Sequence, residues 1–437
     1  MKQSHIAFLA AVGAVAASVS VAAGTEAAAL QSPAERQRIA ALTQRVAELE
    51  HRQATQQLAA GVAGVLEAQV LQDAADRSRL IAVGGFTAGY DGKFALQSED
   101  GSFRIEPGFH FQFRSIANFR DDVDGDDWNA THGFELRRAK PDIGGNVFTE
   151  DFTYYFLFDV SRNDGSTKIE QAWVQYAFEN DWAVRLGQFA TPVFKEQLHS
   201  AKRQLAVERS FLNTVVTGAG QAVSQGVEAI YKGEQLGLAF AFHDGFNSLN
   251  TAALVDEPDF GVSARAEYFF AGDRKQYATF TADGNEQDLL VAGVAGDFTQ
   301  SGSEDVYRYT ADLQWENTAG TGAFAAFYAR TTEDDDTSTT DYGLLLQANQ
   351  MVADDIEVFA QYGLILLDEE AVVLGQAEDT YNLLVIGVNH YYKGHAAKVT
   401  IDAVYLPDGS PQNDTTGGIL ASPDTQFIIR GQFQLLL

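Results

Sequence analysis

Alternation of apolar and polar residues is the dominant pattern of the chain from residue 103 to its end. Near the start of this region the apolar residues Phe103, Ile105, Phe109, Phe111 and Phe113 alternate with Arg104, Glu106, His110, Gln112 and Arg114. A period of two places the first set on one face of a β-strand and the second set on the other face. The same alternation returns at 171–178, 355–364, 398–405 and 427–435. The region therefore predicts many amphipathic strands.

We predict sixteen strands, most of them about ten residues long, which is the length that crosses a bilayer when a strand is tilted. They lie near 103–119, 133–147, 152–161, 168–178, 182–192, 224–232, 235–243, 260–270, 287–299, 306–316, 320–331, 340–349, 355–367, 381–391, 397–406 and 425–435. The predicted fold is all-β: a transmembrane antiparallel β-barrel of about 16 strands over residues 103–437. Residues 84–102 are expected to be a linker that precedes the barrel.

The connections between these strands support the same topology. If the first strand starts in the periplasm, every second connection is a short periplasmic turn, as at Asn180-Asp181 and Gly233-Glu234. The other connections are outer loops, and 120–132, 193–223, 244–259, 368–380 and 407–424 are long. The segment 271–286 departs from the rule. It is either a long periplasmic link or an additional strand.

The first 83 residues have a different pattern. Lys2, the apolar run from Ile6 to Ala17 and the small residues at 21–23 predict a secretory signal peptide over 1–23 and export to the outer membrane. Residues 24–83 predict a periplasmic helical segment. Within it, over 33–72, Ile39, Leu42, Val46 and Leu49 have the spacing of a coiled coil. We expect a short helix that forms a trimer and could contact the cell wall. The alternative is a helix that packs on its own barrel.

Composition and charge narrow the classes of function. The net charge of −30 disfavours nucleic-acid binding, which needs a basic surface. The acidic clusters at 121–127, 333–336 and 368–370 fall in predicted outer loops, so the acidity is compatible with a lipid-facing apolar band. There is no cysteine, the eight histidines have no metal-ligand spacing, and no Gly-x-Ser-x-Gly motif accompanies His199-Ser200. We expect no catalytic site, no metal and no cofactor.

The longest predicted outer loop, 193–223, is basic although the protein is acidic. It contains Lys195, Lys202, Arg203 and Arg209 and few carboxylates. In large barrels such a loop can fold inward and narrow the lumen. A basic inward loop would form a constriction that faces anions. The alternative is a solvated loop on the outer rim.

The strand near 133–147 contains two adjacent arginines. Strict alternation would point either Arg137 or Arg138 into lipid, at a cost of about 2–4 kcal/mol at the bilayer midplane. A β-bulge between them restores an outward apolar face on both sides and turns Glu135, Lys140 and both arginines into the lumen. We therefore predict a bulge and two arginines that line the channel. A salt bridge to Glu135 or to an acid on a neighbouring strand is a compatible alternative role.

Several of these segments resemble the phosphate-selective porin O and P family. The similarity runs from Ser102-Phe103-Arg104 to the last strand and is strongest over 134–246. It lies in the arginine pair followed by Gly-Gly at 137–145, in Phe158-Asp159-Val160-Ser161-Arg162-Asn163, and in Gly187-Gln188-Phe189 with the later Glu208-Arg209. The resemblance implies a sixteen-stranded trimeric channel with the arginine pair at its narrowest point. It thus implies that Arg137 and Arg138 contact the solute.

Beyond residue 209 the chain departs from the family pattern. Cations become few, and Asp355, Glu357 and Asp402 fall on the predicted lumen face. We therefore do not expect strict phosphate selectivity. The basic loop and the arginine pair predict a passive porin for small solutes with a weak to moderate anion preference at the constriction, and phosphate or other oxyanions are candidate solutes. The residues expected to line the pore or to bind the solute are Arg114, Arg137, Arg138, Lys140, Arg185, Lys195, Lys202 and Arg203. The alternative function is a structural envelope protein that tethers the outer membrane to the cell wall through the coiled coil.

Overall fold

The computed structural model describes residues 85–90, 93–120, 129–217, 222–252, 260–334, 337–368 and 379–437, together with positions 42, 44–46, 48 and 49. The chain divides into two units, Met1–Val83 and Gly84–Leu437. In the first unit the described positions are helical, and Leu42, Val46 and Leu49 are exposed. The predicted signal peptide and the other positions of the predicted coiled coil at 33–72 lie outside the described residues. Among the described residues, no helix has the length and apolar character needed to cross a membrane.

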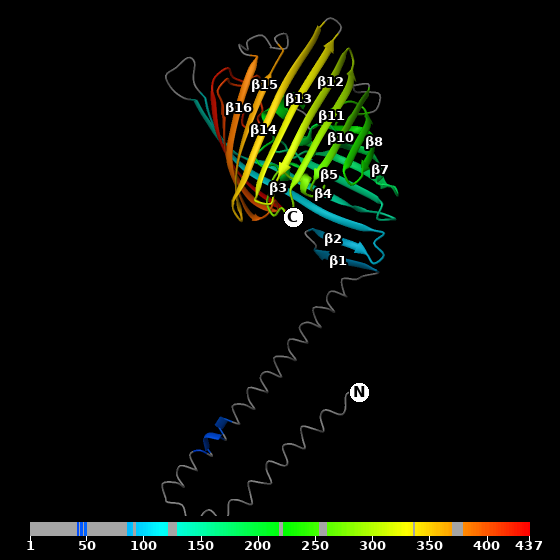
Figure 1. The fold of residues 1–437 in the computed structure, drawn as a ribbon, viewed down its shortest axis with the longest axis vertical. Helices are drawn as coiled ribbons and strands as arrows, with labels where there is room; N and C mark the ends of the chain where they lie inside the picture. The colour runs from blue at the N-terminus through cyan, green and yellow to red at the C-terminus, as the bar shows by residue number, and fades with distance from the viewer. Residues whose placement is uncertain are drawn as a thin grey trace, which may run out of the picture. The chain divides into compact units, whose positions relative to one another are not determined.

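Sixteen antiparallel strands of the second unit close into a barrel (Figure 1), which confirms the predicted fold. They are β3 (Arg104–Arg120), β4 (Asn129–Asn146), β5 (Phe152–Val160), β6 (Thr167–Ala177), β7 (Trp182–Ala190), β8 (Val223–Lys232), β9 (Leu236–His243), β10 (Phe260–Ala271), β11 (Leu289–Ser301), β12 (Glu304–Glu316), β13 (Thr321–Asp334), β14 (Thr337–Ala353), β15 (Ile356–Leu366), β16 (Thr380–Lys393), β17 (Ala397–Leu406) and β18 (Gln426–Leu436). Pairing of β18 with β3, from Gln426 opposite Arg120 to Leu436 opposite His110, closes the ring.

The segment 84–102, predicted to be a linker, contains a hairpin instead. It comprises β1 (Phe86–Tyr90) and β2 (Phe94–Ser98), and Leu96 of β2 pairs with Ile105 of β3. Strands of five residues are too short for alternation to stand out from the surrounding sequence, which is why the pattern did not predict them. The hairpin continues the sheet below the lower rim of the barrel (Figure 1).

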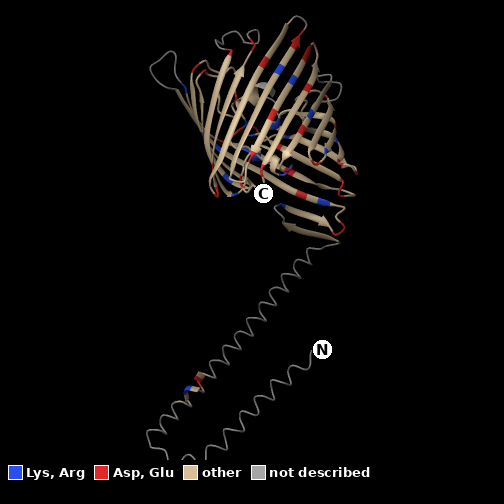
Figure 2. Ribbon diagram, in the orientation of Figure 1, with Lys and Arg blue, Asp and Glu red and all other residues tan. Residues whose placement is uncertain are grey.

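Side chains alternate between the two faces of the barrel wall as predicted. On β3, Gln112 and Arg114 are buried inside, and Phe113 between them is exposed on the outer surface. Acidic residues lie at strand ends and also along the strands (Figure 2). Those within strands include Asp297, Asp312 and Asp402, which are buried in the interior and pair with arginines. This arrangement separates the lipid-facing surface from the charges of the chain.

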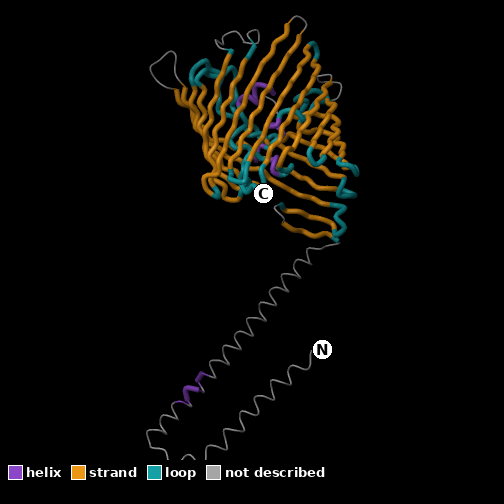
Figure 3. The backbone as a smooth tube through the Cα atoms, viewed as in Figure 1, coloured by secondary structure: helices purple, strands orange, loops and turns teal. Residues whose placement is uncertain are grey.

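The longest connection, between β7 and β8, enters the barrel over its described residues 191–217 and 222, and we call these residues the inward loop. Its helices α3 (Lys195–Leu198), η2 (Ala201–Arg203) and α4 (Phe211–Thr217) lie within the ring of strands (Figure 3). α4 packs against β13, β14 and β15. Phe194, Leu205, Leu212 and their neighbours form an apolar core with inward residues of β13–β18. One side of the interior is therefore a packed core rather than a water-filled lumen.

The segment 272–288 is a link between β10 and β11 and contains no strand, which settles the alternative left open by the sequence. It has one short helix, η3 (Gln276–Ala278), and it also enters the barrel, because Tyr277 and Phe280 are buried. His199 Nε2 of the inward loop lies 2.9 Å from Tyr277 O, and Arg203 Nη1 donates to Ala278 O at 3.4 Å. The inward loop thus rests on a segment that enters from the lower rim.

Candidate solute passage

A β-bulge on β4 turns both members of the arginine pair inward. Gln112 of β3 lies opposite Arg138, and the next residue, Phe113, lies opposite Leu136. Arg137 is the additional residue, so alternation restarts after it. Both arginines bind an interior carboxylate, and Phe134 and Leu136 are exposed on the outer face. The structure thus contains the predicted bulge with both guanidinium groups inside the barrel.

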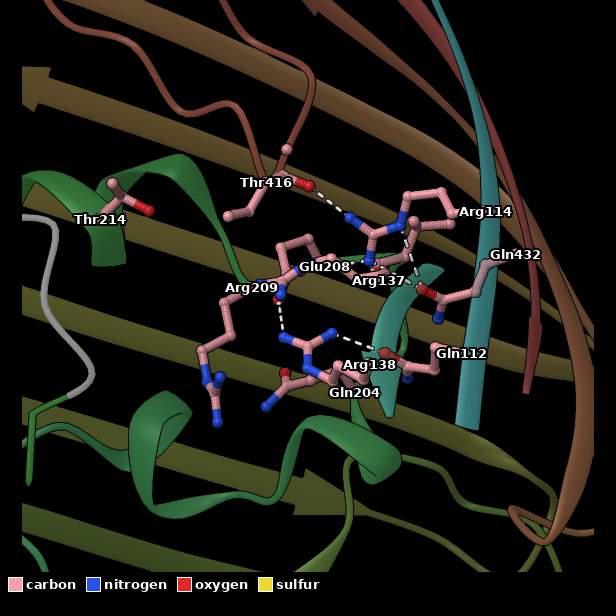
Figure 4. A network of polar contacts seen from close by, with 12 residues as sticks. Gln112, Arg114, Arg137, Arg138, Gln204, Glu208, Arg209, Thr214, Thr416 and Gln432 are labelled. Carbon is pink, nitrogen blue, oxygen red and sulfur yellow. Dashed lines mark hydrogen bonds and ion pairs between the residues drawn. The ribbon is translucent and has the colours of Figure 1, made fainter. Parts of the chain in front are cut away.

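The carboxylate of Glu208, in the inward loop, binds three arginines (Figure 4). Arg138 Nη2 donates to Oε1 at 2.6 Å, Arg137 Nε donates to Oε2 at 2.9 Å, and Arg114 Nη2 donates to Oε2 at 3.1 Å. Arg138 also donates to Gln112 Oε1 at 2.6 Å. Glu208 therefore fastens the inward loop to β3 and β4 and only partly compensates the arginine charge.

The surroundings of Glu208 keep it ionised. Burial alone would raise the pKa of its carboxyl group, but the positive charges of Arg137, Arg138 and Arg114 hold the pKa well below its ordinary value. A protonated Glu208 would remove the counter-charge that these buried guanidinium groups share and would leave Arg114 with Glu135, at 3.6 Å. The ion pairs are accordingly a permanent part of the interior at neutral pH.

Arg114 holds a second loop inside the barrel. Its side chain is fully buried, and Nη1 donates to Thr416 O in the loop 407–425 between β17 and β18. The same loop accepts hydrogen bonds from Asn118 at Gly418 O, 2.7 Å, and from Arg430 at Gly417 O, 3.1 Å. Arg114 Nη2 also donates to Val207 O at 2.8 Å. One arginine thus positions two inward-folded loops relative to each other.

Between these loops and the wall of β3–β6 lies a cavity with a volume of about 590 Å³, which is the candidate solute passage. Among the described residues, six cationic side chains and three carboxylates line it. The cationic residues are Arg137, Arg138, Lys140, Lys202, Arg203 and Arg209, and the acidic residues are Glu170, Glu208 and Asp414. The passage therefore has a positive local charge in a strongly acidic protein.

The cations of the passage differ in how far they are neutralised. Lys140 pairs with Glu170 and lies 3.6 Å from Asp159. Arg209 donates to backbone carbonyl groups of the inward loop, with Nε 3.1 Å from Glu196 O, and points away from the arginine cluster (Figure 4). Arg137 binds Glu208 through Nε alone, which leaves its two terminal nitrogens without a protein acceptor in the part of the chain that the structure describes.

Five of the eight side chains expected to line the pore lie at this passage: Arg137, Arg138, Lys140, Lys202 and Arg203. The other three lie elsewhere. Arg114 is buried behind the loops, and Arg185 pairs with Glu228 at 2.8 Å and stacks on Trp173. Lys195 lies over the ring of Tyr277, where burial lowers its pKa to about 7. These three cations interact with groups inside the protein and do not face the passage. A buried cation needs a charged or aromatic partner more than a solvated cation does.

Sequence reasoning missed the loop 407–425 and the role of Glu208. Glu208 is 70 residues from Arg138 in the chain, and no local pattern connects them. Its position beside Arg209, in the segment that resembles the porin family, was the only signal. Across the described residues, no group of three or more His, Cys, Asp or Glu side chains is placed to hold a metal ion.

Comparison with protein families gives one clear match. The model of the family named phosphate-selective porin O and P matches residues 109–340, which is more than half of the chain. No curated protein matches the chain significantly in sequence.

Solved structures share the fold at low sequence identity. An anion-selective porin from Comamonas acidovorans is 13% identical, with a TM-score of 0.54, 76% of this chain covered and 99% of that chain covered. OprB of Pseudomonas putida is 9% identical, with a TM-score of 0.51 and coverage of 76% and 94%. The outer membrane channel DcaP of Acinetobacter baumannii is 14% identical, with a TM-score of 0.50 and coverage of 76% and 97%.

Proposed function

Because the chain belongs to the phosphate-selective porin O and P family, we propose that it is an outer-membrane porin whose passage prefers anions. Small solutes diffuse through it along their gradients, and the charges of the passage set the local ion concentrations. The excess of cationic over acidic side chains around the passage is the observation that carries the anion preference. The likeness to a porin described as anion-selective supports the same reading.

Arg137 is the best placed solute contact. Its terminal nitrogens have no protein acceptor among the described residues, and the guanidinium fork can donate two parallel hydrogen bonds to a carboxylate or phosphate group. Lys202 and Arg203 line the same passage from the inward loop, and no described carboxylate lies in ion-pair contact with either. An oxyanion could therefore bind weakly at the passage and leave again, as conduction requires.

Reversal potentials in a KCl gradient across a planar bilayer test this proposal. We expect the sign of an anion-preferring channel. Arg137→Ala combined with Arg138→Ala should weaken the preference and raise the conductance, because two cations and their side-chain volume leave the passage. Lys168→Ala combined with Lys393→Ala removes the same charge from exposed positions outside the passage and should change neither quantity. Cation selectivity of the wild-type channel would refute the anion preference.

A further inference from the structure

The lumen face of β5 has two apolar side chains at successive inward positions. Leu157 and Tyr155 line the passage together with Arg137 and Lys202. Inward positions of a channel wall are normally polar because they face water. These two side chains are not part of the apolar core formed with the inward loop. They therefore offer an apolar surface to a solute in the passage.

A third apolar side chain continues this surface onto the neighbouring strand. Trp173 of β6 lies directly opposite Tyr155, with ring centroids 5.7 Å apart and an angle of 38° between the rings. Both rings line a second cavity of about 370 Å³, whose walls include Asp142 and the cations Lys93 and Arg104, both of which pair with Glu106. Leu157, Tyr155 and Trp173 thus form what we call the apolar strip, which runs from the cationic residues of the passage to this second cavity.

The strip offers little polar surface to a ligand. Trp173 Nε1 donates to Gln171 Oε1 at 3.3 Å, and the Tyr155 hydroxyl, which has no hydrogen-bond partner among the described residues, is available as a donor. Arg185 lies 4.5 Å from the centre of the Trp173 ring and pairs with Glu228, so the ring is held in place by a neutralised cation. A hydrated inorganic anion gains at most the hydrogen bond of the Tyr155 hydroxyl, whereas an anion with an apolar body also gains from covering the rings.

We propose that the apolar strip selects organic anions with a hydrophobic ring, namely aromatic carboxylates, over inorganic anions and small carboxylates of equal charge. The carboxylate would bind Arg137 or Lys202 while the ring lies along Tyr155 and Leu157. This inference rests on the proposed anion channel. The competing explanation is packing alone, because Tyr155 lies against Gly144 and Trp173 lies opposite Gly187, where no other side chain fills the space.

Three small molecules distinguish the effect of the solute's negative charge from the effect of its aromatic ring. Benzoate, acetate and benzamide are added in turn to single wild-type channels that conduct KCl. Benzoate should reduce the current at a concentration about three- to tenfold lower than acetate does, which corresponds to one ring contact. Benzamide has the ring without the charge and should have no effect at these concentrations. Equal effects of benzoate and acetate would overturn the proposal.

Variants of the apolar strip test whether its side chains cause the difference between benzoate and acetate. Tyr155→Ser should remove the difference between benzoate and acetate, and Tyr155→Phe should keep it, because the ring remains. Tyr176→Ser is the matched control, since Tyr176 is exposed on the outer face of β6, and it should behave as wild type. If Tyr155→Ser channels lose the wild-type KCl conductance, Leu157→Ser replaces them in the same comparison. An unchanged benzoate effect in that variant would overturn the proposal that the apolar strip binds the ring.

Reversal potentials recorded on the same membranes keep the two proposals apart. A cation-selective wild-type channel defeats the proposed function. An anion-selective channel in which benzoate and acetate act equally leaves the proposed function intact and defeats only the proposed role of the apolar strip.

Discussion

Single residues explain where the alternation rule works and where it fails. The rule predicted the bulge at Arg137 because an arginine in lipid is costly, and that penalty acts at the residue itself. It could not predict that Arg114 is buried by two loops, because those contacts come from Val207 and Thr416, far away in the chain. Inward orientation can thus be predicted from sequence, whereas access to the solute depends on what else occupies the interior.

Glu208→Gln tests the shared carboxylate. Removing its charge leaves Arg114, Arg137 and Arg138 without their common counter-charge, so the anion preference should increase and the inward loop should be less firmly held. The loss of a buried ion-pair partner costs about 3–5 kcal/mol in typical proteins. We expect a larger shift of the reversal potential towards the anion limit, together with increased current noise in single channels. A reduced anion preference would contradict the assigned role.

The pH dependence of this effect follows from the direction of the pKa shift. The folded-state pKa of Glu208 lies below its ordinary value of 4.5, so the stabilisation is present above that value and is lost only as the pH falls through the folded-state pKa. Comparison of wild type with Glu208→Gln should therefore show a constant difference in reversal potential from pH 7 down to about 4.5 and convergence only at lower pH. Convergence between pH 7 and 5 would show that the ion pairs are weaker than the geometry indicates.

At the scale of elements, the inward loop was predicted from its length and basic charge, but it is also attached by an apolar core, which its charge did not predict. The residues 211–217, with the sequence FLNTVVT, mix apolar and polar side chains within seven positions, too few for a helical period to be read. The side chain of Leu212 packs against β14 where Gly343 provides space. A Cβ atom at Gly343 would lie 2.1 Å from Leu212 Cδ1. This complementarity between distant residues has no signature in the local sequence.

Gly343→Val should push α4 away from the wall because the new side chain overlaps Leu212. Overpacking of this kind costs about 1–3 kcal/mol. Leu212→Ala alone creates a cavity and costs about 2–5 kcal/mol. The double variant should be more stable than the sum of the two single losses, because valine fills the space that leucine leaves. Urea unfolding of the refolded barrel, followed on unheated gels, measures all four proteins, and strictly additive losses would argue against the contact.

At the scale of the whole molecule, strand lengths make the barrel wall uneven. Strands β5 and β7 have 9 residues, whereas β14 has 17. The sequence predicted all sixteen barrel strands but not the unevenness, because strand ends inferred from alternation are uncertain by a few residues. β4, with 18 residues, pairs with β5 only over Asp142–Asn146. From Asn129 to Pro141, β4 is therefore not paired with β5.

We expect the predicted homotrimer to form at this part of the wall, where β4 lacks a paired neighbouring strand. An uncovered strand edge is unfavourable in lipid, and a neighbouring copy can cover it under closed threefold symmetry. Phe134, stacked on Phe113 with ring centroids 5.9 Å apart, exposes 74% of its surface there. Phe134→Glu should dissociate the trimer in detergent, as measured by light scattering corrected for bound detergent. Phe327→Glu, which alters an exposed phenylalanine on β13, should leave the trimer intact. A monomeric wild type, or equal behaviour of the two variants, would place the contact elsewhere, because Phe134 is on the strand whose unpaired edge we expect a second copy to cover.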